Sequence, residues 1–276
     1  MSKLPDLLRV FDGAYLPRSR NHPQLLLITS ALSTSSSWLL QHFVRASITN
    51  QPGSLYETDR VPQKRPVVFV SFSHDIDFHS RCFRKAGIDL NALIAQKQLI
   101  YVDGFTKLFV ASPNEEKSVV YLQSANKSGW LNQIMSAIVE FKAGDLLPTL
   151  IFEGLDILHA LGIMNVEEIL RFVQDMQEHS GISIASSNSA NRMLTGMSTL
   201  AEEQRAYLHA LVRRAVAVFS IRPLSTGMAE DVTGAIRITN GGQPCDGRGI
   251  VEEGEFHYFL ADGNVGGVKV FQKGHG

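Results

Sequence analysis

Residues 25–37 read LLLITSALSTSSS, a short apolar run that leads directly into a loop of hydroxyl side chains. The run at residues 25–28 is apolar on both faces and lacks the alternation of a strand with one side in water. Such strands lie in the middle of parallel sheets whose two faces are covered by helices. This stretch therefore predicts a buried central strand that continues through a polar loop into a helix.

The same apolar pattern recurs further along the chain, at residues 66–72, 99–102, 149–152 and 182–185. Apolar residues at helical spacing occur between these strands, over residues 131–139 and 166–176. The second helix has readable ends, because Asn165 and Glu168 have the spacing of a capping box and Gly181 follows its last turn. Strand and helix in alternation, with right-handed crossovers, predict a doubly wound α/β fold with a mostly parallel sheet and helices on both faces.

The C-terminal quarter differs, because no segment of helical length separates its strands. Four strands are expected there, at residues 216–221, 235–239, 256–260 and 268–271. The Gly-rich turns between them predict hairpins that extend the sheet in antiparallel fashion. Two stretches poor in apolar residues, 47–65 and 192–204, are predicted surface loops. We find no internal repeat and no linker, so we expect a single domain over residues 1–276.

The composition excludes several classes of protein. Of 276 residues, 44% are hydrophobic and 19% charged, which excludes a disordered chain. Lys and Arg number 26 against 27 Asp and Glu, a net charge of −1 that excludes nucleic-acid binding through bulk charge. The apolar runs are far shorter than the ~20 residues of a membrane helix, and the N-terminus does not read as a signal peptide. Two cysteines, Cys82 and Cys245, lack metal-ligand spacing. We expect a soluble protein of the cytoplasm that has no membrane partner.

The loop after the first strand stands where a phosphate-binding loop of the form G-x-x-x-x-G-K-[ST] is found. Only Ser37, at the position of the metal-coordinating hydroxyl, fits this pattern. Ser30 and Ser35 replace the two glycines and Ser36 replaces the lysine, so phosphates lose both the close backbone and the neutralising charge. We predict a degenerate loop that caps its helix, and binding of an anion at the helix N-terminus is the alternative.

Two further stretches carry residues suited to metal chemistry. Glu153 ends an apolar strand, where it or Asp156 could hold a magnesium-bound water, although Asp156 also fits the start of a helix. His74 and His79 lie in a polar stretch after the second strand but have no third neutral ligand near them in the sequence. Capping of the next helix by this stretch is the preferred interpretation. We predict no catalytic residue, no cofactor and no metal ligand.

Basic residues are scattered in two small groups. Arg81, Arg84 and Lys85 share one helix face, and Arg213 and Arg214 end another helix. Solvated helix faces explain both groups, and contact with a phosphate backbone in an assembly is the alternative.

The segment from Arg222 onward reads RPLSTGMAEDVTGAIRITNGGQP and contains a specific set of positions. These are Leu224, Thr226, Gly227, Asp231, Val232, Thr233, Gly234, Gly241, Gly242 and Pro244. They resemble the C-terminal signature of the family formed by the sixth subunit of the Elongator complex. The likeness extends upstream to the strand after Pro23, to residues 72–74 and to the strand that ends in Glu153.

This resemblance implies a RecA-like fold and a place in a hetero-hexameric ring with the fourth and fifth Elongator subunits. It implies a non-catalytic subunit, in contact with the remaining Elongator subunits, that binds and releases transfer RNA in the assembled ring. The complex modifies the wobble uridine, U34, in the cytoplasm, with the nucleus as a second compartment. The basic residues named above are weak candidates for transfer RNA contacts. The alternatives are a stand-alone RecA-type ATPase and a scaffold that never touches RNA.

The signature segment contains no pair of residues suited to nucleophilic or acid–base chemistry, so we predict that it serves assembly. Gly227, Gly234, Gly241 and Gly242 fall at expected turns, where the sequence predicts positive φ. Asp231 is expected to hydrogen-bond the backbone of its own turn.

Overall fold

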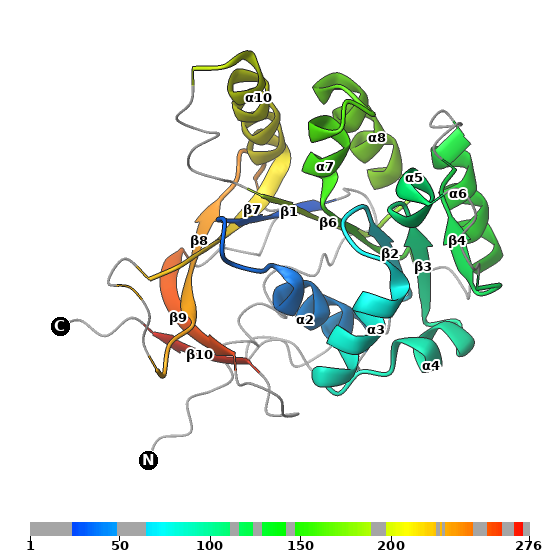
Figure 1. Cartoon of the computed structure of the whole chain (residues 1–276), viewed down its shortest axis with the longest axis horizontal. Coiled ribbons are helices and arrows are strands. Elements are labelled where there is room, and N and C mark those ends of the chain that lie inside the picture. Colours follow the sequence, from blue (N-terminus) through cyan, green and yellow to red (C-terminus); the bar gives the residue numbers. More distant parts are fainter. Residues whose placement is uncertain are drawn as a thin grey trace.

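The computed structural model describes residues 24–48, 65–110, 116–123, 129–141, 147–188, 197–224, 227, 230–244, 253–260 and 268–272. These residues form one sheet between two layers of helices (Figure 1). The strand order is β10-β9-β8-β7-β1-β6-β5-β2-β3-β4. The strands are β1 (Gln24–Ser30), β2 (Val67–Ser71), β3 (Leu99–Asp103), β4 (Val119–Tyr121), β5 (Thr149–Glu153), β6 (Ile182–Asn188), β7 (Ala215–Arg222), β8 (Gly234–Asn240), β9 (Gly254–Leu260) and β10 (Val268–Gln272).

The strands from β7 through β1 to β4 are parallel to their neighbours, as the apolar runs predicted. Every residue of β2, β3 and β5 is buried, because helices cover both faces there. β4 was not predicted. It has three residues and pairs only through the end of β3, so it is too short to produce a periodic signal.

Helices α2 (Ser37–Ile48), α3 (Ile76–Lys85) and α4 (Leu90–Ala95) cover one face. Helices α6 (Trp130–Phe141), α7 (Leu155–Ala160), α8 (Val166–Gln177) and α10 (Thr199–Arg214) cover the other, and α5 (Thr106–Phe109) follows β3. The two predicted helices are confirmed as α6 and α8, and Asn165 and Glu168 form the expected capping box. No helix in the described part of the chain is both long and apolar enough to cross a membrane.

The predicted loop 192–204 is wrong at its C-terminal end, because α10 begins at Thr199. Ser198 caps this helix by accepting a hydrogen bond from the Ala201 amide at 3.2 Å. Ala201 and Gln204 are buried against the sheet, so a weakly apolar first turn is held by packing that the local composition does not reveal. Residues 49–64 of the other predicted loop and residues 192–196 lie outside the described residues, and residues 47–48 complete α2.

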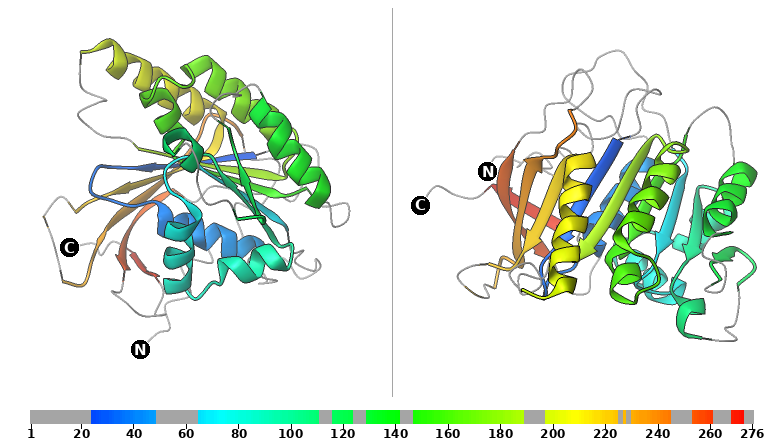
Figure 2. Two further views of the ribbon diagram at one scale, coloured as in Figure 1. Left: turned by 45° about the vertical axis from the view of Figure 1, so that its right-hand side comes forward. Right: turned by 90° about the horizontal axis from the view of Figure 1, so that it is seen from above.

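The C-terminal strands form the predicted antiparallel hairpins. β7 connects the parallel and antiparallel parts of the sheet, because it is parallel to β1 and antiparallel to β8. Figure 2 shows β8, β9 and β10 continuing the sheet beyond β7.

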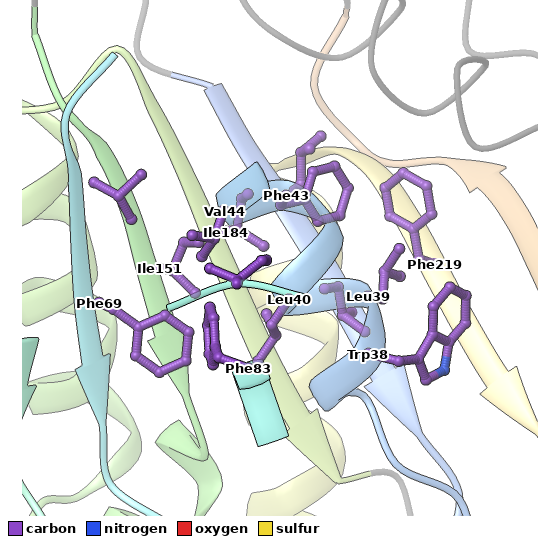
Figure 3. Packing of buried hydrophobic residues seen from close by; sticks show 14 of the residues in the cluster. Trp38, Leu39, Leu40, Phe43, Val44, Phe69, Phe83, Ile151, Ile184 and Phe219 are labelled. Carbon is purple, nitrogen blue, oxygen red and sulfur yellow. The ribbon is translucent and has the colours of Figure 1, made fainter. Parts of the chain in front are cut away.

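The apolar core has two parts, one on each face of the sheet. On one face α2 inserts Leu39, Leu40 and Phe43 against the strands (Figure 3). Trp38 of the same helix stacks on Tyr258 of β9 with ring centroids 4.9 Å apart. The contact of Trp38 with Tyr258 connects α2 to the C-terminal strands.

Candidate functional site

The carboxyl ends of β1, β2, β5 and β6 meet at one edge of the sheet, because these four strands are parallel neighbours in the order β1-β6-β5-β2. Open α/β sheets bind their ligands at this edge. Ser71 at the end of β2 lies opposite Glu153 at the end of β5 in the strand register. The edge therefore gathers side chains that are far apart in the sequence.

The loop after β1 uses its backbone amides within the protein. The Ala31 amide donates to the Ile221 carbonyl at 2.9 Å, and the Thr34 amide donates to the Ala31 carbonyl at 3.0 Å. Ser33, between them, has a left-handed conformation with φ of 76°. The Ser37 amide donates to the Ser35 hydroxyl at 3.2 Å. A phosphate-binding loop points such amides at its ligand, whereas these three are already engaged.

Glu153 is buried at the centre of a hydrogen-bonded cluster. The Ser71 hydroxyl lies 2.9 Å from its Oε2, and the Ser37 hydroxyl lies 3.4 Å from its Oε1. Nε2 of His79 lies 2.8 Å from Oε2, and Nδ1 of His74 lies 3.5 Å from the same oxygen. The structure thus brings Glu153 together with His74 and His79, which the sequence analysis treated as separate candidate sites.

The backbone around His74 is fixed by neighbouring strands and by the start of α3. Its carbonyl lies 2.8 Å from the Ser71 hydroxyl and accepts a hydrogen bond from Tyr101 of β3 at 3.2 Å. Asp75 caps α3 by accepting a hydrogen bond from the Phe78 amide at 2.8 Å, which confirms the predicted capping role of this stretch. Ser71 and Tyr101 were missed in the sequence, because a serine at the end of an apolar strand and a tyrosine within one are both weak signals.

Electrostatics keep the Glu153 carboxyl ionised despite its burial. Removal from water by itself raises the pKa of this carboxyl, but hydrogen bonds and charge from His74 and His79 outweigh that effect and hold the pKa well below its usual range. The pKa of Tyr101 is raised well above its usual value, first by burial and then by the charges of Asp103 and Glu153. Tyr101 therefore stays protonated and able to donate to the His74 carbonyl.

Asp156 lies in the first turn of α7, as predicted from its place after the strand. It is buried, and burial raises the pKa of its carboxyl against the opposing hydrogen bonds from Asn188 and Ser187 at the end of β6. Its carboxyl contributes no ligand to the cluster around Glu153.

The prediction of positive φ at the signature glycines is correct for Gly227, with φ of 91°, and wrong for Gly234, Gly241 and Gly242. Glycine is required at these three positions for a different reason, because other backbone atoms lie where a Cβ would be. A Cβ on Gly241 would lie 1.9 Å from the Ala215 carbonyl oxygen, and one on Gly242 would lie 2.6 Å from Arg213 backbone atoms. The end of β8 therefore packs directly on the junction of α10 and β7.

Other signature residues serve the β8–β9 hairpin or lie exposed. The Thr233 amide donates to the Tyr258 carbonyl at 2.8 Å, and its hydroxyl accepts from the Leu260 amide at 2.9 Å. The side chains of Asp231 and Pro244 are exposed, and Leu224 is half-buried. Thr226 lies outside the described residues.

The two basic groups do not form one patch. Arg81, Arg84 and Lys85 are exposed on α3, whereas Arg213 and Arg214 end α10 on the opposite face of the sheet (Figure 1). Arg214 donates to the Leu170 carbonyl of α8 at 3.3 Å, so it joins two helices of the fold.

These features define a class: doubly wound α/β proteins in which the loop after the first strand lacks the glycines and lysine that bind phosphate. Residues 16–262 match the family model described as ELP6, Elongation complex protein 6, and the chain belongs to this family.

Two relatives have similar sequences. The Elongator complex protein 6 homolog of Schizosaccharomyces pombe is 23% identical over 220 residues, which cover 76% of this chain and 81% of the relative. Elongator complex protein 6 of Xenopus laevis is 22% identical over 210 residues, covering 72% of this chain and 77% of the relative.

Proposed function

We propose that the chain is a non-catalytic subunit of the Elongator complex. In this proposal it forms a hetero-hexameric RecA-like ring with the fourth and fifth subunits. The ring binds and releases transfer RNA and is required for modification of wobble uridine U34 by the whole complex. We place it in the cytoplasm, with the nucleus as a second compartment. The observation that carries the proposal is the family match over residues 16–262.

The geometry of the carboxyl edge supports an accessory role. Serines replace the phosphate-binding residues, and three backbone amides of the loop already donate hydrogen bonds to oxygen atoms of the protein. Glu153 lies at the end of a strand separated from β1 only by β6, and its Oε1 is 3.4 Å from the Ser37 hydroxyl. Here this carboxylate is bonded to serine and histidine side chains of the chain itself.

The decisive experiment is co-expression of the tagged chain with the fourth and fifth subunits, followed by native mass measurement. The proposal expects one mass that corresponds to two copies of each subunit. A monodisperse chain that leaves both partners unbound would overturn it. ATP hydrolysis by the homogeneous lone chain, abolished by Ser37→Ala, would instead establish the ATPase alternative.

Binding of transfer RNA should require the assembled ring. The net charge of −1 provides no long-range attraction for a polyanion, and the two basic groups lie on opposite faces. Basic residues pooled from several subunits should give an affinity that falls steeply with salt, because phosphate contacts release counterions. Equal affinity of the lone chain and the ring for transfer RNA at one salt concentration would contradict this. A ring that does not bind transfer RNA would favour the scaffold alternative.

The role of the signature segment in assembly is best tested at an exposed side chain. Gly234→Val would damage the chain itself, because a Cβ there would lie 2.7 Å from the Tyr258 hydroxyl and 2.8 Å from the Arg222 carbonyl oxygen. Asp231→Ala avoids this problem and should weaken ring formation, with loss of U34 modification as a consequence. Asp175→Ala, at an exposed position of α8, is the matched control. An intact Asp231→Ala ring that fails to support modification would show a direct role in handling RNA.

A further inference from the structure

Three side chains with metal-binding atoms converge at the carboxyl edge of the sheet. They are His74 after β2, His79 on α3 and Glu153 at the end of β5, and one ligand atom of each lies within 4.8 Å of the others. Two imidazole nitrogens and one carboxylate oxygen are a donor set used for zinc, with the fourth tetrahedral position left to water. Imidazole ligands favour zinc and its transition-metal neighbours over magnesium and calcium.

The fold holds each ligand in place independently of the others. Ser71 and Glu153 are register partners on adjacent parallel strands, so the carboxylate is fixed where β2 ends. The ring of His74 stacks on Phe78 with centroids 3.9 Å apart and planes 11° from parallel. The ring of His79 packs edge-on against Phe69 at 5.0 Å. In metal sites, neighbouring residues orient the side chains that bind the ion, as these contacts do here.

The polar contacts of His79 are directed at the cluster. The residue is 1% exposed, and its Nδ1 has no hydrogen-bond partner among the described residues. Its Nε2 lies 2.8 Å from Glu153 and 3.2 Å from the Ser71 hydroxyl. Nε2, which faces Glu153, is therefore the ring nitrogen placed to bind an ion.

The cluster is buried at Glu153 and open to solvent at His74. Glu153 is 4% exposed, and its ion-pair partners in the structure are His74 and His79. The side chain of His74 is 38% exposed, so the cluster reaches solvent on that side.

We propose that His74, His79 and Glu153 bind a divalent transition-metal ion, with zinc the ion that fits the donor set best. The ion links the end of β2, the first turn of α3 and the end of β5, next to Ser37 of the loop after β1. This inference is independent of ring formation and of RNA binding.

The test uses the full chain, stripped with a chelator, dialysed, and titrated with ZnCl₂ in competition with a chromophoric chelator. We expect one zinc per chain with a dissociation constant of about 10 μM or tighter. Titration with CoCl₂ should give the visible absorption of tetrahedral cobalt, and MgCl₂ should not compete. Absence of saturable one-to-one binding, or equal competition by magnesium, would overturn the proposal.

Variants locate the ion. His74→Gln, at the partly exposed ligand, should weaken zinc binding by at least about 100-fold. His209→Gln, the same change at an exposed position of α10, should bind as the unchanged chain does. Zinc should raise the Tm of the unchanged chain and of His209→Gln but not that of His74→Gln, a comparison that holds even if the variant is less stable without metal. Wild-type affinity in His74→Gln would overturn the site.

Discussion

The two halves of the sheet are stabilised in different ways. In the parallel half, β2, β3 and β5 are buried along their whole length and lie between two layers of helices. In the antiparallel half, β8 contains buried, half-buried and exposed residues, and β9 contains buried and half-buried residues. There the fit depends on backbone contact at glycines such as Gly241. Packing of apolar side chains thus stabilises the parallel half. Part of the antiparallel half instead depends on glycines, whose lack of a side chain lets backbone segments come into contact.

The largest effect is expected from Gly241→Ala. The new Cβ would lie 1.9 Å from the Ala215 carbonyl oxygen and 2.5 Å from its carbon, so two backbone segments must separate. We expect a loss of about 3 kcal/mol, the upper end of the usual cost of overpacking, in the free energy of unfolding measured by chemical denaturation. Gly227→Ala is the matched comparison, because its Cβ would meet none of the described residues within 4 Å and the positive φ should cost about 1–2 kcal/mol. Equal losses in the two variants would refute a role for close approach.

Truncation of apolar side chains should show the opposite preference. Ile151→Ala in β5 creates a cavity between the sheet and the helices on one of its faces and should cost about 2–5 kcal/mol. Val268→Ala in β10, where the side chain is half-buried, should cost about 1 kcal/mol or less. Denaturation of both variants under one set of conditions measures the difference. Similar costs would mean that the antiparallel half relies on side-chain packing as much as the parallel half.

A smaller, pH-dependent effect is expected at Asp156, at the carboxyl edge of the parallel half. Because burial raises the pKa of this carboxyl in the folded chain, the folded state binds the proton more tightly than the unfolded state. Its contribution to stability therefore falls as pH rises from the ordinary value of about 3.9 through the raised one. Asp156→Asn should gain stability relative to the unchanged chain at neutral pH and lose that advantage in acid. A difference that stays constant from pH 4 to 8 would contradict this.

The smallest effect should come from the surface of the antiparallel half. Arg222 of β7 and Glu255 of β9 form an ion pair at 2.8 Å, with the arginine side chain 40% exposed. Solvent screens such a pair, so Arg222→Gln should cost only about 0.2–1 kcal/mol. The cost should shrink in high salt, which denaturation with and without ~1 M NaCl would reveal. If the loss of unfolding free energy is the same with and without NaCl, the cause would be lost packing of the aliphatic part of the arginine side chain.

Patterns within short segments predicted much of the fold. The apolar runs, the capping box at Asn165 and the Gly-rich hairpins each depend on neighbours close in sequence, and the structure contains all three. The start of α10 and the strand β4 escaped prediction, since their formation depends on packing against distant elements. The signature segment was recognised as a pattern, but positive φ was the right reason for Gly227 and the wrong one for Gly234, Gly241 and Gly242.

The sequence by itself determined a doubly wound α/β chain, its serine-rich loop and its family, because these follow from local periodicity and residue identity. Tertiary structure alone decided that Glu153 meets Ser71, 82 positions away, and with it His74 and His79. The physical reason is strand pairing: β2 and β5 become neighbours only when the whole sheet assembles, and nothing near Glu153 in the sequence specifies that partner. The close contact of Gly241 with Ala215 is of the same kind, since it exists only once β8 has packed on β7.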